Sequence, residues 1–173
     1  QKLPLMIGVS VCEALKEFDF ELKLKWPNDI ILDDKKIGGI LCESKNINNV
    51  KTVVIGLGMN INEKADDFPN NLRKSAISLS MVANKTFQRE RVLANILNHI
   101  EKNLDLLKEK NLELFKKWES FCNHINKEVT FHNNDINVIG RFLNISNEGN
   151  AIIEINNEER TYSSGIIEIN NSI

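Results

Sequence analysis

Charged and amide side chains gather in one short stretch, residues 25–43, around a proline and a pair of glycines. The stretch reads Lys-Trp-Pro-Asn-Asp (25–29), Ile-Ile-Leu (30–32), Asp-Asp-Lys-Lys (33–36) and Ile-Gly-Gly-Ile-Leu-Cys-Glu (37–43). A lysine ammonium is a compact charge for phosphate, and glycine lets a ligand approach the backbone because it lacks a Cβ atom. Lys36, just before Gly38 and Gly39, therefore indicates an anion site. The alternative is that Lys36 is a solvated turn residue like Lys35.

Asn28 and Asp29 follow a proline that fixes the local backbone. One interpretation is that Asn28 reads a polar edge of a ligand, while Asp29 acts as a base or charge partner and is held by Lys25. The other is that an Asn-Asp pair in a turn only satisfies its own backbone. The residues alone leave both open.

A third piece follows at residues 54–62, Val-Ile-Gly-Leu-Gly-Met-Asn-Ile-Asn. Glycine inside a strand often marks a bulge or a close approach of the backbone to a ligand, so Gly56 and Gly58 are a weak signal by themselves. We expect this segment, with Asn60 at its end, to converge with the two pieces above on one anionic ligand.

The apolar spacing predicts the elements that must position these residues. Apolar residues recur at helical intervals over 4–18, 88–108 and 112–121, with one or two helical turns within 75–82. Shorter apolar runs predict strands over 21–25, 29–33 and 36–45, and a buried strand over 51–61. Trp118 is expected to be an anchor of the core.

The composition changes after residue 124, where short apolar runs alternate with Asn, Asp and Gly turns, one of them at 133–135. The predicted strands are 128–131, 136–145, 151–155 and 161–169. The expected fold is α/β, of the α+β type. Residues 1–123 are expected to form a mixed sheet flanked by helices, and residues 124–173 a small β-barrel or half-barrel domain of the SH3-like kind.

Composition excludes several classes of function. The net charge of −2 gives no basic surface for nucleic acid, and there is no apolar run long enough to span a membrane. Three widely spaced cysteines predict free thiols and a reducing, cytoplasmic setting, and with the three histidines they form no zinc spacing, so no metal site is expected. The start at Gln1, directly before an apolar helix, predicts the interior of a longer protein.

Taken together, the three motifs at 25–29, 36–43 and 54–62 resemble the biotin protein ligase family (biotin–acetyl-CoA-carboxylase ligase), and the order of the predicted helices and of the β-rich tail resembles it too. The resemblance implies an enzyme that uses ATP and Mg²⁺ to form biotinyl-5′-AMP. It then transfers biotin to a lysine of the biotin carboxyl carrier protein of acetyl-CoA carboxylase.

The resemblance also implies roles for single residues. Lys36 matches the lysine that contacts the reacting carboxylate and phosphate, and Asp29, with Lys25 beside it, matches a carboxylate near the acceptor amine. The residues matched to substrate binding are Asn28 and Asn60 on the adenine side, and Gly39 and Ile40 along biotin and the adenylate. Trp26 and Pro27 are expected to be structural supports.

Two departures from the family pattern affect these expectations. The Gly-Arg-Gly-Arg-type loop of the family lies upstream of these motifs and is absent from the 173 residues, so we expect this chain alone to be inactive or nearly so. In the last strand, Ile166 and Asn170 stand where the family commonly has an acidic residue and an arginine. Alternative interpretations are an inactive folding module that dimerises through a sheet edge, and a relative of the lipoate–protein ligases.

Overall fold

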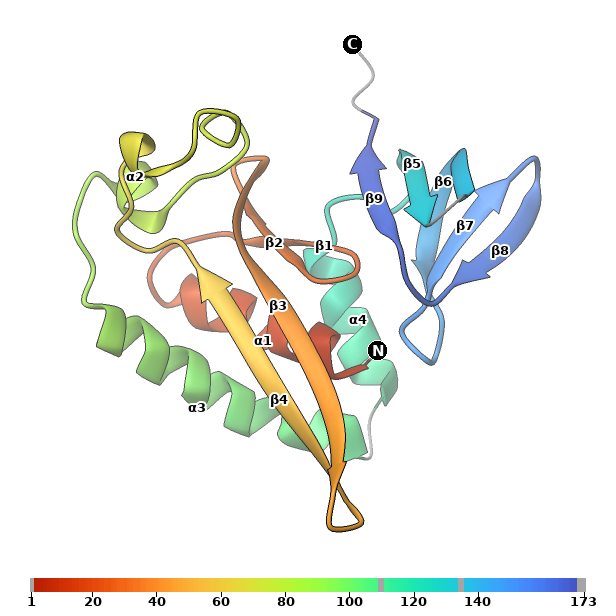
Figure 1. Cartoon of the computed structure of the whole chain (residues 1–173), viewed down its shortest axis with the longest axis horizontal. Coiled ribbons are helices and arrows are strands. Elements are labelled where there is room, and N and C mark those ends of the chain that lie inside the picture. The colour runs from red at the N-terminus through yellow and green to blue at the C-terminus, as the bar shows by residue number, and fades with distance from the viewer. Residues whose placement is uncertain (1, 109–110, 134–135, 171–173) are drawn as a thin grey trace.

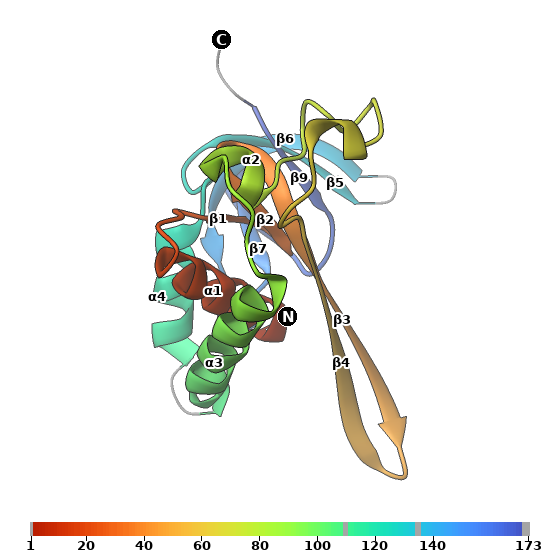
Figure 2. The ribbon, with the colours of Figure 1, turned by 90° about the vertical axis from the view of Figure 1, so that its left-hand side faces the viewer.

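The computed structural model describes residues 2–108, 111–133 and 136–170, and they form two antiparallel sheets and a layer of helices. The first sheet has the order β1-β2-β3-β4. Its strands are β1 (Lys23–Lys25), β2 (Asp29–Leu32), β3 (Lys35–Ile47) and β4 (Val50–Met59). The helices α1 (Lys2–Lys16), α3 (Arg89–Lys108) and α4 (Asn111–Phe121) all lie on one side of this sheet (Figures 1 and 2). The segment between β4 and α3 holds the short η1 (Ala65–Asp67) and α2 (Leu79–Ala83).

The second sheet follows α4 and has the order β8-β7-β6-β5-β9. Its strands are β5 (Glu128–Asn133), β6 (Ile136–Ile145), β7 (Ala151–Ile155), β8 (Glu158–Tyr162) and β9 (Ile166–Ile169). The first and last strands of this order, β8 and β9, are not paired with each other in the described residues. The SH3-like topology predicted for the tail is therefore an open sheet and not a closed barrel.

The helical layer forms because α1 is apolar nearly all round and needs covering on both sides. Ten of its residues are buried between the first sheet and the other helices. Its neighbour α3 presents one buried stripe of spacing i, i+4, i+7, which is the signature of an amphipathic helix. That stripe contains Val92, Ile96, His99, Asn103 and Leu106. Trp118 on α4 is 2% exposed, which confirms it as a core anchor.

Three two-residue hairpin turns set the strand registers. Each has two Asp or Asn residues in the left-handed region, at Asp33-Asp34, Asn48-Asn49 and Asn156-Asn157, with φ between 49° and 65°. Tight hairpins favour such residues because both central positions need positive φ. The charged turn predicted between the strands of the 25–43 stretch is the first of the three.

The structure corrects three expectations. Residues 52–56 of β4 are exposed, so the predicted buried strand is wrong: the β3–β4 hairpin extends past the helices, and its far end has no covering element in the described residues (Figure 2). The predicted strand over 161–169 is broken at Gly165, whose φ of 148° suits only glycine. The named strands pair only antiparallel, and the parallel component of the expected mixed sheet is limited to two isolated bridges, Leu24 with Cys122 and Lys36 with Ala76.

Two further expectations concern the turn at 133–135 and the lack of a membrane-spanning segment. The turn predicted at 133–135 falls partly on residues 134 and 135, which lie outside the described residues. No helix in the described ranges is both long and apolar enough to cross a membrane.

A candidate anion-binding site between the two sheets

One row of paired residues crosses all four strands of the first sheet. Lys25 pairs with Asp29, Asp29 with Gly39, and Gly39 with Gly58. Directly paired residues of neighbouring strands project from the same face of a sheet. The row is therefore a continuous line of functional groups on one face, and we call these four residues the site row.

The face that carries the site row is the one turned away from the helices. The next row, on the opposite face, contains Leu24, Ile30 and Gly38, which are buried toward α1. A Cβ atom added to Gly8 of α1 would lie 3.0 Å from Leu24, which shows how closely the helix packs there. Burial of one face thus leaves the other face of the same strands free for ligand.

A β-bulge brings Lys36 to this face. Ile30 pairs with Gly38 but Ile31 pairs with Lys36, so Ile37 is an extra residue in β3. Ile37 points into the core with no exposure, and the register shift places Lys36 on the side of Gly39. A Cβ atom added to Gly39 would lie 3.6 Å from the Nζ atom of Lys36. Bulges often re-aim a side chain in this way next to functional sites.

Asp29 holds both lysines of the site. The Lys36 Nζ atom lies 2.5 Å from Oδ1 of Asp29, and the Lys25 Nζ atom lies 3.5 Å from Oδ2. The Asp29 side chain is 17% exposed, whereas that of Lys36 is 54% exposed. The three groups carry a net charge of about +1, with the mobile ammonium of Lys36 on the solvent side. Such an arrangement can receive an anion without moving the backbone.

A shallow hollow of about 430 Å³ lies over the glycines of the same face. A Cβ atom on Gly58 would meet nothing within 4 Å, so packing does not require glycine there. Glycine weakens a strand, and the open space above Gly58 is consistent with close approach of a ligand. We call this space the glycine hollow. Its lining residues are Asn28, Gly39, Ile40, Leu41, Gly56, Leu57 and Gly58.

Asn28 forms one end of the glycine hollow, where both its side chain and its backbone hydrogen-bond to Ile40 of β3. Its Nδ2 atom donates to the Ile40 carbonyl at 2.7 Å, and its own carbonyl accepts from the Ile40 amide at 3.0 Å. Ile40 is 3% exposed and contributes mainly backbone to this wall. The amide of Asn28 is therefore oriented by the sheet, which makes it a fixed polar edge.

Trp26 and Pro27, which lie between the site residues Lys25 and Asn28, have a structural role. The Trp26 side chain is fully buried, and its Nε1 atom donates to the Gly149 carbonyl of the second sheet at 3.1 Å. Its ring centroid lies 6.5 Å from that of Phe131. The peptide bond between Trp26 and Pro27 is cis. The prediction that Trp26 is a structural support agrees with this burial.

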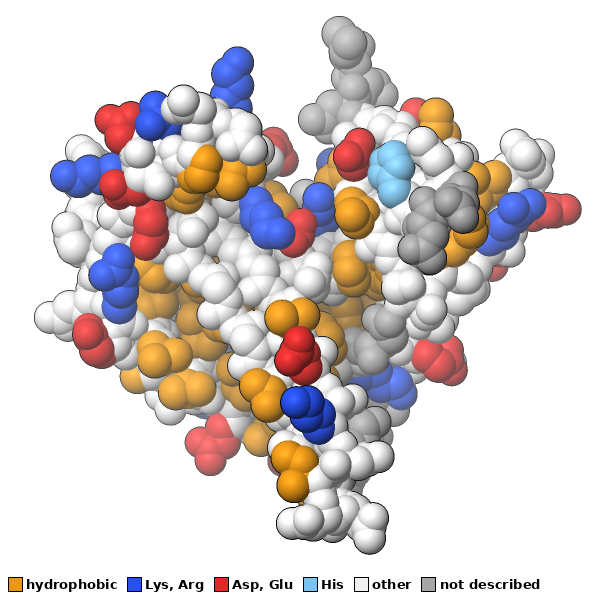
Figure 3. Space-filling view, in the orientation of Figure 1, with side chains coloured by type: hydrophobic (Ala, Val, Ile, Leu, Met, Phe, Trp, Pro, Cys, Tyr) orange, Lys and Arg blue, Asp and Glu red, His pale blue; other side chains and the backbone are white. Residues whose placement is uncertain are grey.

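A cleft of about 380 Å³ separates the site row from the second sheet, and we call it the intersheet cleft. Figure 3 shows this notch between the two halves of the molecule, with basic and acidic side chains along it. The first sheet contributes Lys25, Asp29, Ile31, Asp34 and Lys36, and residues outside it contribute Ser75, Asn123, Lys127, Glu168 and Ile169. The residues from 123 onward were not predicted, because only tertiary contact brings them to the motifs.

Asn60 lies beyond Gly58 and acts as a brace in this structure. Its Nδ2 atom donates to the Ile77 carbonyl at 3.0 Å, and the Ile77 amide in turn donates to the Lys36 carbonyl. It does not line the glycine hollow or the intersheet cleft. Its predicted contact with substrate stays a prediction, and its observed contacts fix the backbone of Lys36.

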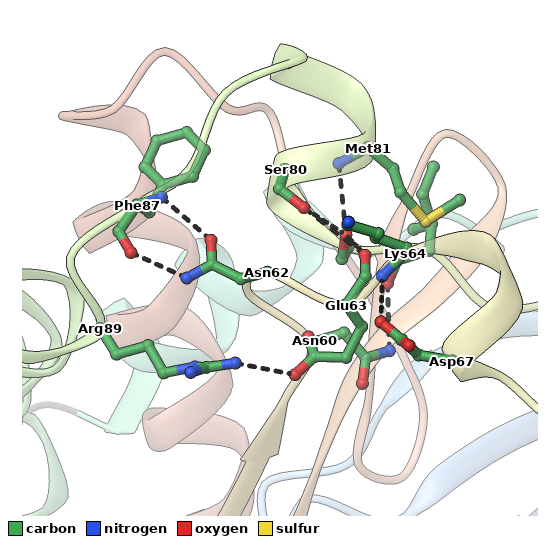
Figure 4. A network of polar contacts seen from close by, with 11 residues as sticks. Asn60, Asn62, Glu63, Lys64, Asp67, Ser80, Met81, Phe87 and Arg89 are labelled. Atoms are coloured by element: carbon green, nitrogen blue, oxygen red, sulfur yellow. Dashed lines mark hydrogen bonds and ion pairs between the residues drawn. The ribbon is translucent and has the colours of Figure 1, made fainter.

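The braces continue along the segment that follows β4 (Figure 4). Asn62 exchanges two hydrogen bonds with the backbone of Phe87, its Nδ2 atom donating at 2.8 Å and its Oδ1 atom accepting at 2.9 Å. Glu63 binds Arg89 through Oε1 at 3.3 Å, and its carbonyl accepts from Ser78. These bonds hold residues 60–63 against the start of α3.

The cysteines and histidines give no sign of a metal centre. No group of three or more metal-binding side chains occurs in the described ranges, and Cys12, Cys42 and Cys122 are free thiols. Burial raises the pKa of Cys122 to about 12 and lowers that of His124 to about 3, with Lys25 and Lys127 adding to the latter shift. Both groups are therefore neutral near pH 7 and serve the packing between α4 and the second sheet.

A larger hollow lies far from these motifs, between residues 17–19 and 85–98, with a volume of about 710 Å³. It contains none of the predicted site residues. Two of its aromatic rings already carry a cation, Arg91 over Phe18 and Lys85 over Phe87. Size alone therefore does not mark the functional site in this chain, and we base the site on the convergence of charge and glycine around Lys36.

The chain is similar to a family of known ligases. The model of the biotin/lipoate A/B protein ligase family matches residues 3–60, which include the site row. The bifunctional ligase/repressor BirA of Bacillus subtilis is 32% identical over 171 residues, covering 97% of this chain and 53% of that protein. BirA of Escherichia coli is 26% identical over 159 residues, covering 88% and 48%. The chain thus spans about half the length of these curated relatives.

Solved structures show the same fold over almost the whole chain. The biotin protein ligase of Aquifex aeolicus is 32% identical, with a TM-score of 0.85 over 99% of this chain and 75% of that one. The structure of that ligase in complex with biotin and ATP is 31% identical, with a TM-score of 0.83 over 99% and 72%. The chain therefore belongs to the biotin protein ligase family.

Proposed function

We propose that this chain carries part of the active site of a biotin–protein ligase. That enzyme forms biotinyl-5′-AMP from biotin and ATP and transfers biotin to a lysine of a biotin carboxyl carrier protein. The proposal rests on one observation. The bulge turns Lys36 to the same face of the sheet as the site row, where glycines leave space for a ligand. A related ligase, that of Aquifex aeolicus, has been solved in complex with biotin and ATP.

In the first step, a biotin carboxylate oxygen attacks the α-phosphorus of ATP. A new P–O bond forms, the bond to the β-phosphate bridge oxygen breaks, and pyrophosphate leaves with the electron pair. Two anions must meet for this reaction, so a cation that offsets their repulsion and the developing charge lowers the barrier. The half-exposed ammonium of Lys36 is placed for this role, since it can turn from Asp29 toward the ligand while its backbone stays braced.

In the second step, the amine of the carrier lysine attacks the carbonyl carbon of the mixed anhydride. The C–N bond forms, the C–O bond to phosphate breaks, and AMP leaves. The attacking amine must lose a proton, and a carboxylate within reach can accept it. Asp29 takes this role in the proposal, with Lys25 keeping the carboxylate oriented when Lys36 has moved to the phosphate.

The substrate contacts follow the glycine hollow. We assign Gly39 and Ile40 to its wall along biotin and the adenylate, and Asn28 at its end to the adenine side. Asn60, which lies outside the hollow, is assigned to the adenine side by the family resemblance alone. The residues in the described ranges do not fit a protein-held Mg²⁺, because Asp29 is neutralised by two lysines and no acidic cluster is present. Mg²⁺ would accordingly enter as part of the Mg-ATP substrate, which is the usual mode for this ion at phosphates.

The remaining parts of the proposal concern organisation and partners. The two sheets correspond to a partial catalytic domain, residues 1–123, and a C-terminal SH3-like domain, residues 124–173. The acceptor is the carrier protein of acetyl-CoA carboxylase, and the three free thiols suit a cytoplasmic setting. In the described residues the outer edge of β4 is unpaired and bears exposed Val50 and Val54, so a second copy could pair there.

The test is biotin-dependent release of pyrophosphate, with biotinyl-5′-AMP identified by mass spectrometry. It is run on this chain and on a protein that adds an upstream Gly-Arg-Gly-Arg-type loop. We expect turnover in the longer protein, little in the chain alone, and a loss of about 10²-fold or more in Lys36→Ala. Adenylate formed from lipoate but not from biotin would contradict the biotin assignment. Unchanged turnover in Lys36→Ala would contradict the role of Lys36.

A further inference from the structure

Lys127 brings a third ammonium group to the intersheet cleft, from the opposite side to Lys25 and Lys36. It lies between α4 and the start of β5, and it lines the cleft together with Asp29 of the site row. Lys127 is about one hundred residues from Lys25 in sequence and lies just before the second sheet, whereas Lys25 belongs to the first. Both sides of the cleft therefore carry lysines, and its lining also includes the carboxylates of Asp29, Asp34 and Glu168.

The backbone of Lys127 is fixed, and its exposed side chain extends from that fixed point. The Lys127 amide donates to the His124 carbonyl at 3.1 Å, and its carbonyl accepts from the Phe142 amide at 3.0 Å. Asn123, four residues earlier, donates its amide to the carbonyl of Leu24, the residue before Lys25 in β1, at 3.1 Å. This short path ties Lys127 directly to the strand that carries Lys25.

Two of the acidic groups near Lys127 have other partners. The Glu128 carboxylate accepts from Nδ2 of Asn170 at 3.2 Å, and Glu168 lies 3.7 Å from Nε2 of His132. Lys127 itself has no ion-pair partner in the parts of the chain that the structure describes. Burial lowers the pKa of His124, and the charges of Lys25 and Lys127 lower it further. Lys25 and Lys127 line the same cleft, in which Asp29 is engaged by Lys25 and Lys36.

We propose that Lys127 binds the pyrophosphate part of the nucleotide across the intersheet cleft, opposite Lys36. The inference rests on the proposed function, because it takes Lys36 to be the cation at the reacting phosphate. The two phosphates beyond that atom carry the most concentrated negative charge of the substrates, and the cleft leads from Lys36 toward Lys127. An ammonium at its far side would hold the leaving group in line, and would couple the second sheet to the first step.

The test is calorimetric titration of this chain with inorganic pyrophosphate alone, without biotin. We expect Lys127→Ala to weaken binding at least about tenfold, which is the scale of one lost charge-assisted hydrogen bond. Lys127→Arg should restore most of the affinity. The matched control is Lys102→Ala on α3, an exposed lysine outside the cleft, and it should bind as the wild-type chain does. Equal melting temperatures of the variants would confirm that the comparison is between folded proteins.

Other results would overturn the proposal. These are no binding of pyrophosphate by the wild-type chain, or equal binding by wild type and Lys127→Ala. If pyrophosphate affinity is unchanged but Lys127→Ala raises the KM for the carrier protein, Lys127 belongs to a docking surface for an acidic carrier segment instead. Failure of the proposed function has a different result: Lys127-dependent binding of pyrophosphate would persist, while a biotinyl-adenylate analogue would not bind.

Discussion

The ammonium of Lys36 lies 2.5 Å from the Asp29 carboxylate because Ile37 is an extra residue in β3. Without that bulge the alternation of the strand would send Lys36 to the face that packs on α1, where an unpaired charge is costly. The bulge instead buries Ile37 and gives Lys36 to the open face. Asp29, Lys36 and the glycines of the site row thus form one functional unit.

Asp29 should matter most for the transfer of biotin. In Asp29→Asn the side chain keeps its shape but can no longer accept a proton, so we expect transfer to the carrier lysine to slow by about 10² or more. Formation of biotinyl-5′-AMP should fall much less. Single-turnover measurement of the two steps in an active protein separates them. Equal slowing of both steps would contradict a role as base and would leave Asp29 as a holder of Lys36.

Two glycines of adjacent strands should respond in opposite ways to alanine. A Cβ atom on Gly38 would lie 2.5 Å from the Gly58 carbonyl, so Gly38→Ala should lower the melting temperature. A Cβ atom on Gly58 would meet open space, so Gly58→Ala should be as stable as the wild type, or slightly more so. We nevertheless expect Gly58→Ala to weaken binding of a biotinyl-adenylate analogue by about tenfold, because about 1.4 kcal/mol of lost close contact has that effect. Unchanged affinity would show that ligand does not approach Gly58.

Trp26 should couple the two sheets. In Trp26→Phe the Gly149 carbonyl loses its buried donor, which costs about 1–3 kcal/mol of the free energy of unfolding. Urea titration followed by circular dichroism measures this loss. The prediction fails if Trp26→Phe is as stable as the wild-type chain.

His124 should make the junction between α4 and the second sheet sensitive to acid. Burial lowers its pKa from the ordinary 6.5 to about 3, so between these values the unfolded chain binds a proton that the folded chain does not. Its contribution to stability is present above about pH 6.5 and is lost as the pH falls toward 3, by up to about 1.4 kcal/mol per pH unit.

The variant His124→Phe tests that origin, because a phenyl ring can pack between Trp118 and Phe142 without taking up a proton. The free energy of unfolding is measured by urea titration between pH 7.5 and pH 4. We expect His124→Phe to lose less stability than the wild type over this range. Parallel curves for the two proteins would assign the acid sensitivity to other groups.

The sequence predicted the positions of the helices and strands better than it predicted which of their residues are buried. The strands 136–145 and 151–155 agree with β6 and β7, because alternation and turn residues are local signals. Apolar content also predicted burial of residues 51–61, but much of β4 is exposed, since burial depends on what covers a strand. The break at Gly165 was not predicted, because its positive φ and the Phe131 ring packed where a Cβ would stand are features of the folded chain.

The candidate site was also predicted only in part. The motifs identified Lys25, Asn28, Asp29, Lys36 and Gly39 as candidates, and the structure brings all five together. The bulge at Ile37 was not predicted, because an extra residue in a strand changes the strand pairing and leaves no signal in the amino-acid composition. Lys127 had no sequence signal at all, since tertiary contacts such as the bridge between Leu24 and Cys122 bring its segment to the site row.

The most direct test of the account is calorimetric titration of this chain with a non-hydrolysable biotinyl-adenylate analogue, comparing wild type, Lys36→Ala and Lys35→Ala. The two lysines are neighbours at the start of β3, and of the two only Lys36 pairs with Asp29. The account predicts that wild type and Lys35→Ala bind alike, and that Lys36→Ala binds at least about tenfold more weakly. Equal affinity of Lys36→Ala and Lys35→Ala, or no binding by the wild-type chain, would contradict it.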